Sequence, residues 1–144
     1  MIVQAIEQYK PVLVLSLGLS AKSTTIEVET FGLNLKRSPF NEGGFLLPRR
    51  INLSGPFIRK STFDTKDMVL SIRDEDIAVK QSFFAGMYIC NTVLYETIGY
   101  IQTHNLEIKS GFIHVPFLNS QHPQGMELHI MIQAIRIAIQ TNLN

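Results

Sequence analysis

Cys90 and His114 are the residues of this sequence whose types could together support nucleophilic catalysis. Cys90, the sole cysteine, follows a short apolar run and precedes a stretch with helical spacing, which predicts a strand-to-helix junction. Unpaired N–H groups and the helix dipole at such a junction favour a thiolate and can hold an oxyanion. A lone cysteine is more often a small buried hydrophobe. Position alone therefore leaves both interpretations open.

His114 lies in the apolar segment 111–117, near the predicted carboxyl end because Pro116 closes the strand. A histidine there can face the same edge of a sheet as Cys90, which would allow a thiolate–imidazolium pair. A structural histidine is the alternative interpretation. Three other histidines are assigned to structure or solvent, because they follow a helix, lie in a Gly/Pro-rich loop or belong to the last helix: His104, His122 and His129.

A Cys–His pair usually needs a third group that orients the imidazole, and this group is commonly acidic. Glu27 and Glu29 are two residues apart in the strand-like segment 26–35, so they would share one face. A solvated pair is the ordinary interpretation of both, and composition does not choose among the 12 acidic residues. The residues alone thus give a candidate dyad, two nearby acids and no substrate.

Short apolar runs alternate along the chain with segments of helical spacing. The predicted strands are 12–17, 26–35, 77–83 and 111–117. The predicted helices are 2–9, 64–75 with Asp64 as its cap, 90–101 and 126–139. Residues 36–54 contain Pro, Gly, Asn and paired Arg and are predicted to be irregular. The alternation predicts an α/β fold, a three-layer α/β/α arrangement with a mostly parallel doubly wound sheet, whose sites gather at strand carboxyl ends.

Composition bounds the class of protein. A length of 144 residues with 45% apolar residues predicts one domain, 1–144, with its own core. The formal charge of +1 gives no electrostatic reason to expect nucleic acid or an anionic membrane as partner. The apolar runs are too short to cross a bilayer, and the N-terminus lacks the pattern of a secretion signal. A single cysteine excludes an internal disulfide and a cysteine-rich zinc site. We therefore expect a cytoplasmic protein.

Four segments resemble motifs of the pyroglutamyl peptidases, also called pyrrolidone-carboxylate peptidases. Segment 82–91, SFFAGMYICN, resembles the nucleophile motif, in which a Ser, an Ala-Gly pair, an aromatic and a Val precede Cys-Asn. Segment 111–118, GFIHVPFL, is similar to the histidine motif. Segment 26–35, IEVETFGLNL, is similar to the acid-bearing strand, and 37–43, RSPFNEG, to an Arg-Ile-Pro-Asp-Asn-Glu-Gly motif. Order and spacing agree, and the resemblance extends to about residue 121.

The resemblance implies a phosphorylase/hydrolase-like fold and an omega-peptidase that removes N-terminal pyroglutamate from peptides, with no metal or organic cofactor. It implies Cys90 as nucleophile and His114 as base, and it selects Glu29 rather than Glu27 as the acid. The positions that it implies for contact with the substrate or its oxyanion are Leu19, Arg37, Tyr88 and Ile89.

The chain also departs from the family pattern. It has no Gly-Phe-x-Pro-Phe-Gly-Gly motif, which in the family precedes the part matched here, so a shortened sheet is expected. The loop 18–23, GLSAKS, stands where the family has Gly-Gln-Ala-Gly-Gly-Arg, so Leu19 replaces a glutamine associated with lactam recognition. Ser38 and Phe40 replace an Ile and an Asp. The alternative function is therefore a catalytically inactive binding protein. An exposed sheet edge also leads us to expect a homo-oligomer.

Overall fold

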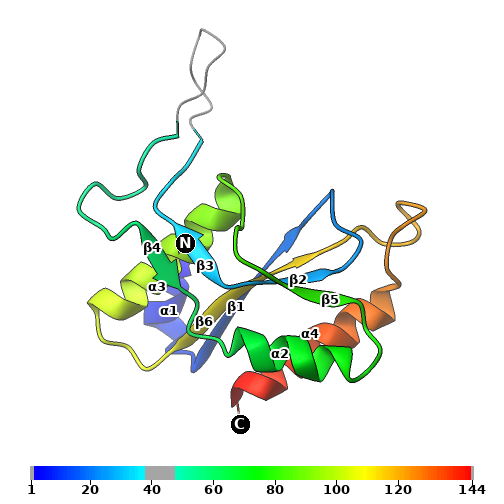
Figure 1. Ribbon diagram of the computed structural model, residues 1–144. Coiled ribbons are helices and arrows are strands. Elements are labelled where there is room, and N and C mark those ends of the chain that lie inside the picture. Colours follow the sequence, from blue (N-terminus) through cyan, green and yellow to red (C-terminus); the bar gives the residue numbers. More distant parts are fainter. Residues whose placement is uncertain (1, 38–47, 144) are drawn as a thin grey trace, which may run out of the picture.

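The computed structural model describes residues 2–37 and 48–143, and its centre is a four-stranded sheet with helices on both faces (Figure 1). The strands lie in the order β1 (Leu13–Leu19), β6 (Lys109–Val115), β2 (Ile26–Glu29) and β5 (Val79–Ser82). Strands β1 and β6 are parallel, as are β2 and β5, whereas β2 and β6 are antiparallel. The predicted α/β class with a mostly parallel sheet between helical layers is confirmed.

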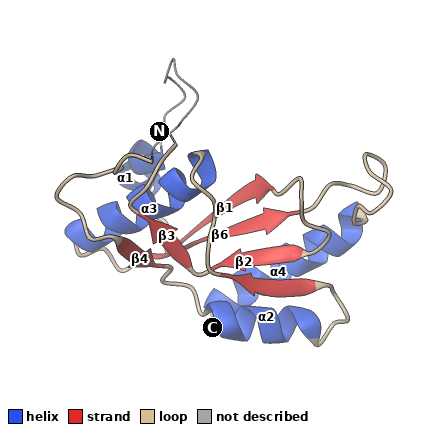
Figure 2. Cartoon of the chain, turned by 45° about the horizontal axis from the view of Figure 1, so that its top comes forward, coloured by secondary structure: helices blue, strands red, loops and turns tan. Residues whose placement is uncertain are grey.

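Helices α2 (Thr65–Arg73) and α4 (Leu128–Leu143) pack together against one face of the sheet, as Figure 2 shows. Helix α2 begins as predicted, because the Asp64 side chain accepts a hydrogen bond from the Asp67 N–H at 3.3 Å. Helices α1 (Ile2–Tyr9) and α3 (Ile89–Thr103) contact each other on the opposite side, and α3 packs against β6. None of the helices in the described part of the chain is long and apolar enough to cross a membrane.

The alternation of side chains along β2 separates the core from the polar site. Ile26 and Val28 are fully buried in the core that α2 and α4 cover. Glu27 and Glu29 therefore project toward the side of α3. In the antiparallel register Glu27 lies opposite His114, so this histidine points to the same face. The candidate acids and the candidate base thus share one surface of the sheet.

The predicted strand 26–35 is in fact two strands that belong to different sheets. After β2, strand β3 (Phe31–Leu33) pairs antiparallel with β4 (Ile58–Lys60), which the sequence pattern did not predict. Gly32 in β3 lies directly on α3, since a Cβ there would be 2.9 Å from the Tyr95 backbone. The chain therefore leaves the central sheet to make a small sheet packed on the helix that carries Cys90. Ser38 and Phe40 lie outside the described residues.

Candidate active site

His114 and Glu29 form a buried pair on the α3 side of the sheet. The Nδ1 atom of His114 lies 2.7 Å from Oε1 of Glu29, and the two residues are only 8% and 1% exposed. Glu27, the other acid considered, instead pairs with Lys80 at 2.8 Å. The structure therefore brings Glu29 onto the imidazole nitrogen. Because Nδ1 is engaged there, Nε2 is the nitrogen left for another partner.

Cys90 occupies the first turn of α3 and lies over the carboxyl end of β1. A Cβ placed on Gly18 would be 3.1 Å from the Cys90 Sγ, and Gly18 is the parallel-ladder partner of His114. Cys90 packs against the apolar cluster that contains Phe112, and the Phe112 ring centroid is 4.9 Å from that of His114. The thiol and the imidazole therefore lie one strand apart on the same face.

The environment of Cys90 disfavours ionisation of its thiol. Burial raises the pKa of the Cys90 thiol, its own backbone N–H partly offsets this effect, and the Glu29 carboxylate raises the pKa further. The expectation that the helix N-terminus would lower this pKa is therefore wrong, because desolvation outweighs the N–H contact. In the free chain the thiol keeps its proton to a higher pH than an ordinary cysteine does.

The pH dependence of alkylation tests this direction. Because the pKa of Cys90 is raised, the thiolate fraction at neutral pH is small, and the iodoacetamide rate should rise at a pH above the ordinary thiol range. Glu29→Gln removes a negative charge that opposes ionisation, so its rate profile should move to lower pH. The measurement is the alkylation rate by mass spectrometry across pH. A wild-type midpoint below that of free cysteine would contradict the assignment.

Asn91, the residue after Cys90, ties the first turn of α3 to the small sheet. Its side chain is fully buried, accepts a hydrogen bond from the Leu33 N–H at 2.8 Å, and donates to the carbonyls of Leu33 and Leu35 at 2.8 Å each. The sequence analysis did not identify this role. The sequence feature that could have indicated it is an amide residue in the first turn of a predicted helix. Such side chains often form hydrogen bonds with neighbouring backbone groups.

Arg37 approaches the same turn from outside. Its backbone N–H donates to the carbonyl of Met87 at 2.8 Å, and its Nη1 donates to the Tyr88 hydroxyl at 2.6 Å. The guanidinium also lies 5.6 Å from the Tyr88 ring centroid. Arg37, Tyr88 and the exposed Ile89 therefore form a rim next to Cys90, which brings together three of the four residues predicted to contact substrate.

Two features of this rim differ from the sequence prediction. Leu19 is 53% exposed at the end of β1, and strand alternation points it away from the face on which Gly18 meets Cys90. Phe83 and Phe84, which were not predicted as site residues, are 59% and 53% exposed on the segment that leads to Cys90. Adjacent phenylalanines after a predicted strand end were the available signal. Exposed aromatic side chains on this segment suit contact with a ligand.

Gly18 is required by the close approach of β1 to Cys90. A methyl group at this position would lie 2.8 Å from the Phe112 ring and 3.1 Å from the Cys90 Sγ, so both must move. We expect Gly18→Ala to lower the free energy of unfolding by about 2 kcal/mol, as overpacking does, and to change the alkylation rate of Cys90. Urea unfolding measures the first effect. Ser16→Ala, on the same face of the same strand, is the control and should change neither quantity.

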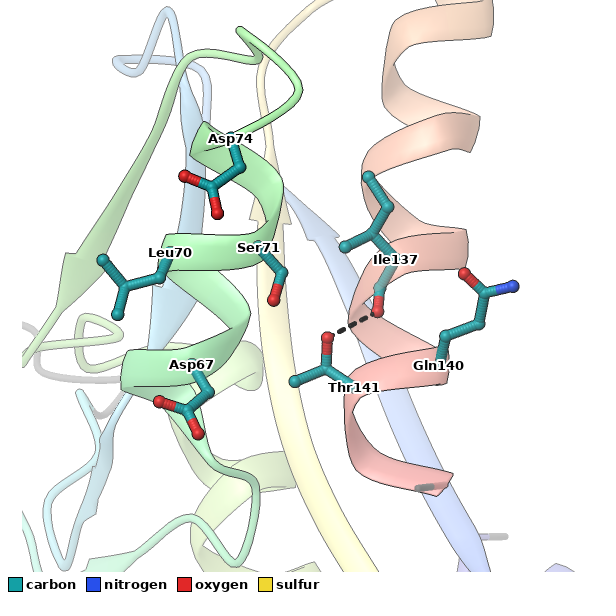
Figure 3. A pocket seen from close by; sticks show the side chains of 7 residues that line it. All are labelled: Asp67, Leu70, Ser71, Asp74, Ile137, Gln140 and Thr141. Atoms are coloured by element: carbon teal, nitrogen blue, oxygen red, sulfur yellow. Dashed lines mark hydrogen bonds between the residues drawn. The ribbon is translucent and has the colours of Figure 1, made fainter.

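A groove of about 500 Å³ between α2 and α4 lies away from this site (Figure 3). Its lining contains two carboxylates, hydroxyl groups and an amide, but no cysteine or histidine. In Figure 3 the Thr141 hydroxyl is already engaged with the carbonyl of Ile137, at 2.9 Å. The groove thus has no cysteine–histidine pair, and the candidate residues Cys90 and His114 lie on the opposite face of the sheet.

The chain matches the family model described as pyroglutamyl peptidase over residues 1–144. It is 30% identical to a pyrrolidone-carboxylate peptidase of Thermococcus litoralis, an alignment that covers 96% of this chain and 69% of that protein. It is 34% identical to the pyrrolidone-carboxylate peptidase of Yersinia pseudotuberculosis, with 96% and 68% of the two chains covered.

Solved structures resemble the fold closely. The pyrrolidone carboxyl peptidase from Thermococcus litoralis superposes with a TM-score of 0.89 at 27% identity, over 98% of this chain and 70% of that one. The pyroglutamyl peptidase I from Bacillus amyloliquefaciens gives 0.88 at 27% identity, with the same coverage. The matched region thus spans nearly the whole of this chain and about 70% of these relatives.

Proposed function

Because the chain belongs to the pyroglutamyl peptidase family, we propose that it is a cysteine-type omega-peptidase that hydrolyses N-terminal pyroglutamate from peptides. One observation carries the proposal: the buried Glu29–His114 contact of 2.7 Å lies one strand away from the Cys90 thiol. A nucleophile, a base and a group that orients the base are the parts that acyl transfer requires. Cys90, His114 and Glu29 fill these roles.

The first half of the reaction transfers the pyroglutamyl group to sulfur. As the Cys90 sulfur attacks the carbonyl carbon, the thiol proton passes to Nε2 of His114 and the carbonyl oxygen becomes an oxyanion. Glu29 stabilises the imidazolium through Nδ1. Collapse of the intermediate breaks the C–N bond, and His114 gives the proton to the leaving amine. This order suits a thiol whose pKa is raised, because the proton leaves only during attack.

The second half releases pyroglutamate. Water attacks the thioester while His114 accepts one of its protons, and the S–C bond then breaks as that proton returns to sulfur. The N–H of Cys90, in the first turn of α3, has no acceptor within its own helix and can donate to the oxyanion in both halves. Arg37 lies at the adjacent rim and supplies positive charge there. We assign Tyr88 and Ile89 to contact with the substrate.

The test is hydrolysis of a fluorogenic pyroglutamyl amide by the purified chain, with Cys90→Ser as the matched inactive variant. The corresponding prolyl amide, in which a protonated pyrrolidine replaces the neutral lactam, is the control substrate. Activity that is confined to the pyroglutamyl amide and lost in Cys90→Ser would support the peptidase. No turnover by folded wild-type chain would exclude the peptidase. It would favour the alternative of a binding protein.

We further propose that the protein self-associates through β1. This strand ends the central sheet, contains no charged residue or proline, and leaves Leu17 and Leu19 each 53% exposed. Such an edge lacks the usual protection against pairing. It is also self-complementary about a two-fold axis, which favours a second copy as partner. Light scattering should give a mass above that of the monomer, and Leu17→Lys should lower it. A monomeric wild-type chain would contradict the proposal.

A further inference from the structure

A cluster of three metal-type donors surrounds the imidazole that serves as the base. Glu27, Glu29 and His114 each offer one ligand atom, and these atoms lie within 4.8 Å of one another. We propose that they form a site for a zinc-type divalent cation, separate from the thiol, that withdraws His114 from catalysis when it is filled. The binding site does not depend on the proposed peptidase activity, whereas the inhibition rests on it.

The backbone arranges these donors together. Glu27 and His114 are directly opposed in the antiparallel ladder of β2 and β6, and Glu29 lies two residues from Glu27 on the same face. A tetrahedral zinc ion with bonds of about 2.0–2.1 Å separates its ligands by roughly 3.3 Å. The widest separation in the cluster therefore has to close by at most about 1.5 Å. Side-chain rotation about χ angles is sufficient for such a movement.

The two carboxylates have capacity for a cation. Oε2 of Glu29 is buried and has no hydrogen-bond partner among the described residues, an unusual state for a carboxylate oxygen. Glu27 is the more exposed of the two, since its side chain is 15% exposed against 1% for Glu29. Its carboxylate is thus the one that an incoming cation reaches first.

Lys80 shows that the cluster attracts positive charge, and it lies on the exposed side by which an ion would enter. Its ammonium group lies 2.8 Å from Oε1 of Glu27, so a cationic group already occupies the outer side of the cluster. The Lys80 side chain is 57% exposed and that of Glu27 15% exposed, whereas Glu29 is closed off. A metal ion would therefore enter past Lys80 and compete with it for Glu27.

Metal binding would disable the base by taking its Nδ1 lone pair. In the free chain Nδ1 lies 2.7 Å from Glu29, which holds the ring with Nε2 available to the thiol. A cation between Nδ1 and Glu29 replaces the shared proton and adds positive charge to the ring. A ring that is bound in this way is a poorer proton acceptor at Nε2, so it would not take the Cys90 proton efficiently.

Zinc titration by calorimetry on the metal-free chain tests the site. We expect Glu27→Gln to weaken zinc binding at least about tenfold, since even second-shell losses cost 10–100-fold. Lys80→Met should strengthen binding about fivefold by removing a competing cation worth up to about 1 kcal/mol. Cys90→Ser should leave the affinity within about twofold. Cobalt(II), added as a spectroscopic probe, should give tetrahedral d–d bands without a thiolate charge-transfer band.

Each arm can overturn the proposal. Loss of zinc binding in Cys90→Ser would place the metal on the thiol instead, and unchanged binding in Glu27→Gln would remove the second carboxylate from the site. No zinc binding by wild-type chain would exclude the site outright. If Glu27→Gln fails to fold, Lys80→Met still tests the site, because tighter zinc binding is expected for that variant. The zinc affinity of each variant can also be measured in the Cys90→Ser background. The binding results therefore remain decisive if the chain has no peptidase activity.

Discussion

Glu29→Gln is expected to lower kcat/KM for a pyroglutamyl amide by about 10⁴-fold, the size of effect seen when the orienting acid of a triad becomes an amide. The carboxylate is buried and 2.7 Å from His114, so no water can take its place. An amide at this position removes the charge that stabilises the imidazolium. It can also donate to Nδ1 and so hold the ring in the wrong tautomer. Steady-state kinetics on the fluorogenic amide measures the loss.

The same substitution should make Cys90 easier to ionise, because the Glu29 charge raises the pKa of the thiol. The variant thus separates two effects that usually change together: alkylation moves to lower pH while peptidase turnover falls. Glu96→Gln is the matched control, because it makes the same chemical change on the exposed side of α3. Retention of more than about a tenth of wild-type kcat/KM in Glu29→Gln would show that His114 is not oriented by this acid.

The fold could be predicted in class from sequence because local patterns are strong where strands are buried. The apolar run that became β1 required no tertiary information. Helical spacing predicted α4 but not its buried face, since Met131, Ala134 and Ala138 are buried whereas Leu128 and Ile132 are exposed. The break between β2 and β3 could not be predicted. It depends on Gly32 meeting α3, a contact between segments more than 60 residues apart. Strand β4, only three residues long, has too short a pattern to distinguish it from a loop.

The candidate site could be predicted in its residue types but not in its electrostatics. Glu27 and Glu29 were equivalent by position, and the strand pairing distinguishes them, since Lys80 of β5 lies beside Glu27. The thiol pKa was predicted in the wrong direction because burial of the thiol and the Glu29 charge both depend on segments distant in the sequence. The local sequence predicts where a helix begins and hence where its dipole acts, whereas desolvation of the thiol depends on how the whole chain folds around it.

The role of Asn91 was not identified from the sequence, and it leads to the second large effect. We expect Asn91→Ala to lower the free energy of unfolding by about 3 kcal/mol, because the Leu33 N–H and two carbonyls each lose a buried partner. Thr92→Ala, at the next residue, removes one exposed hydrogen bond of 3.3 Å to Tyr88 and should cost less than about 1 kcal/mol. Urea unfolding of both variants gives the comparison.

Asn91→Asp distinguishes lost hydrogen bonds from lost volume. The substitution is nearly isosteric and keeps an acceptor for the Leu33 N–H, but it points an oxygen at the carbonyls of Leu33 and Leu35. At neutral pH a buried carboxylate in this position should destabilise the fold at least as much as alanine. Stability should recover relative to wild type as pH falls and the acid is protonated, because a carboxylic acid can again donate. If Asn91→Asp were as stable as wild type at neutral pH, the donor contacts to the two carbonyls would not hold the nucleophile turn in place.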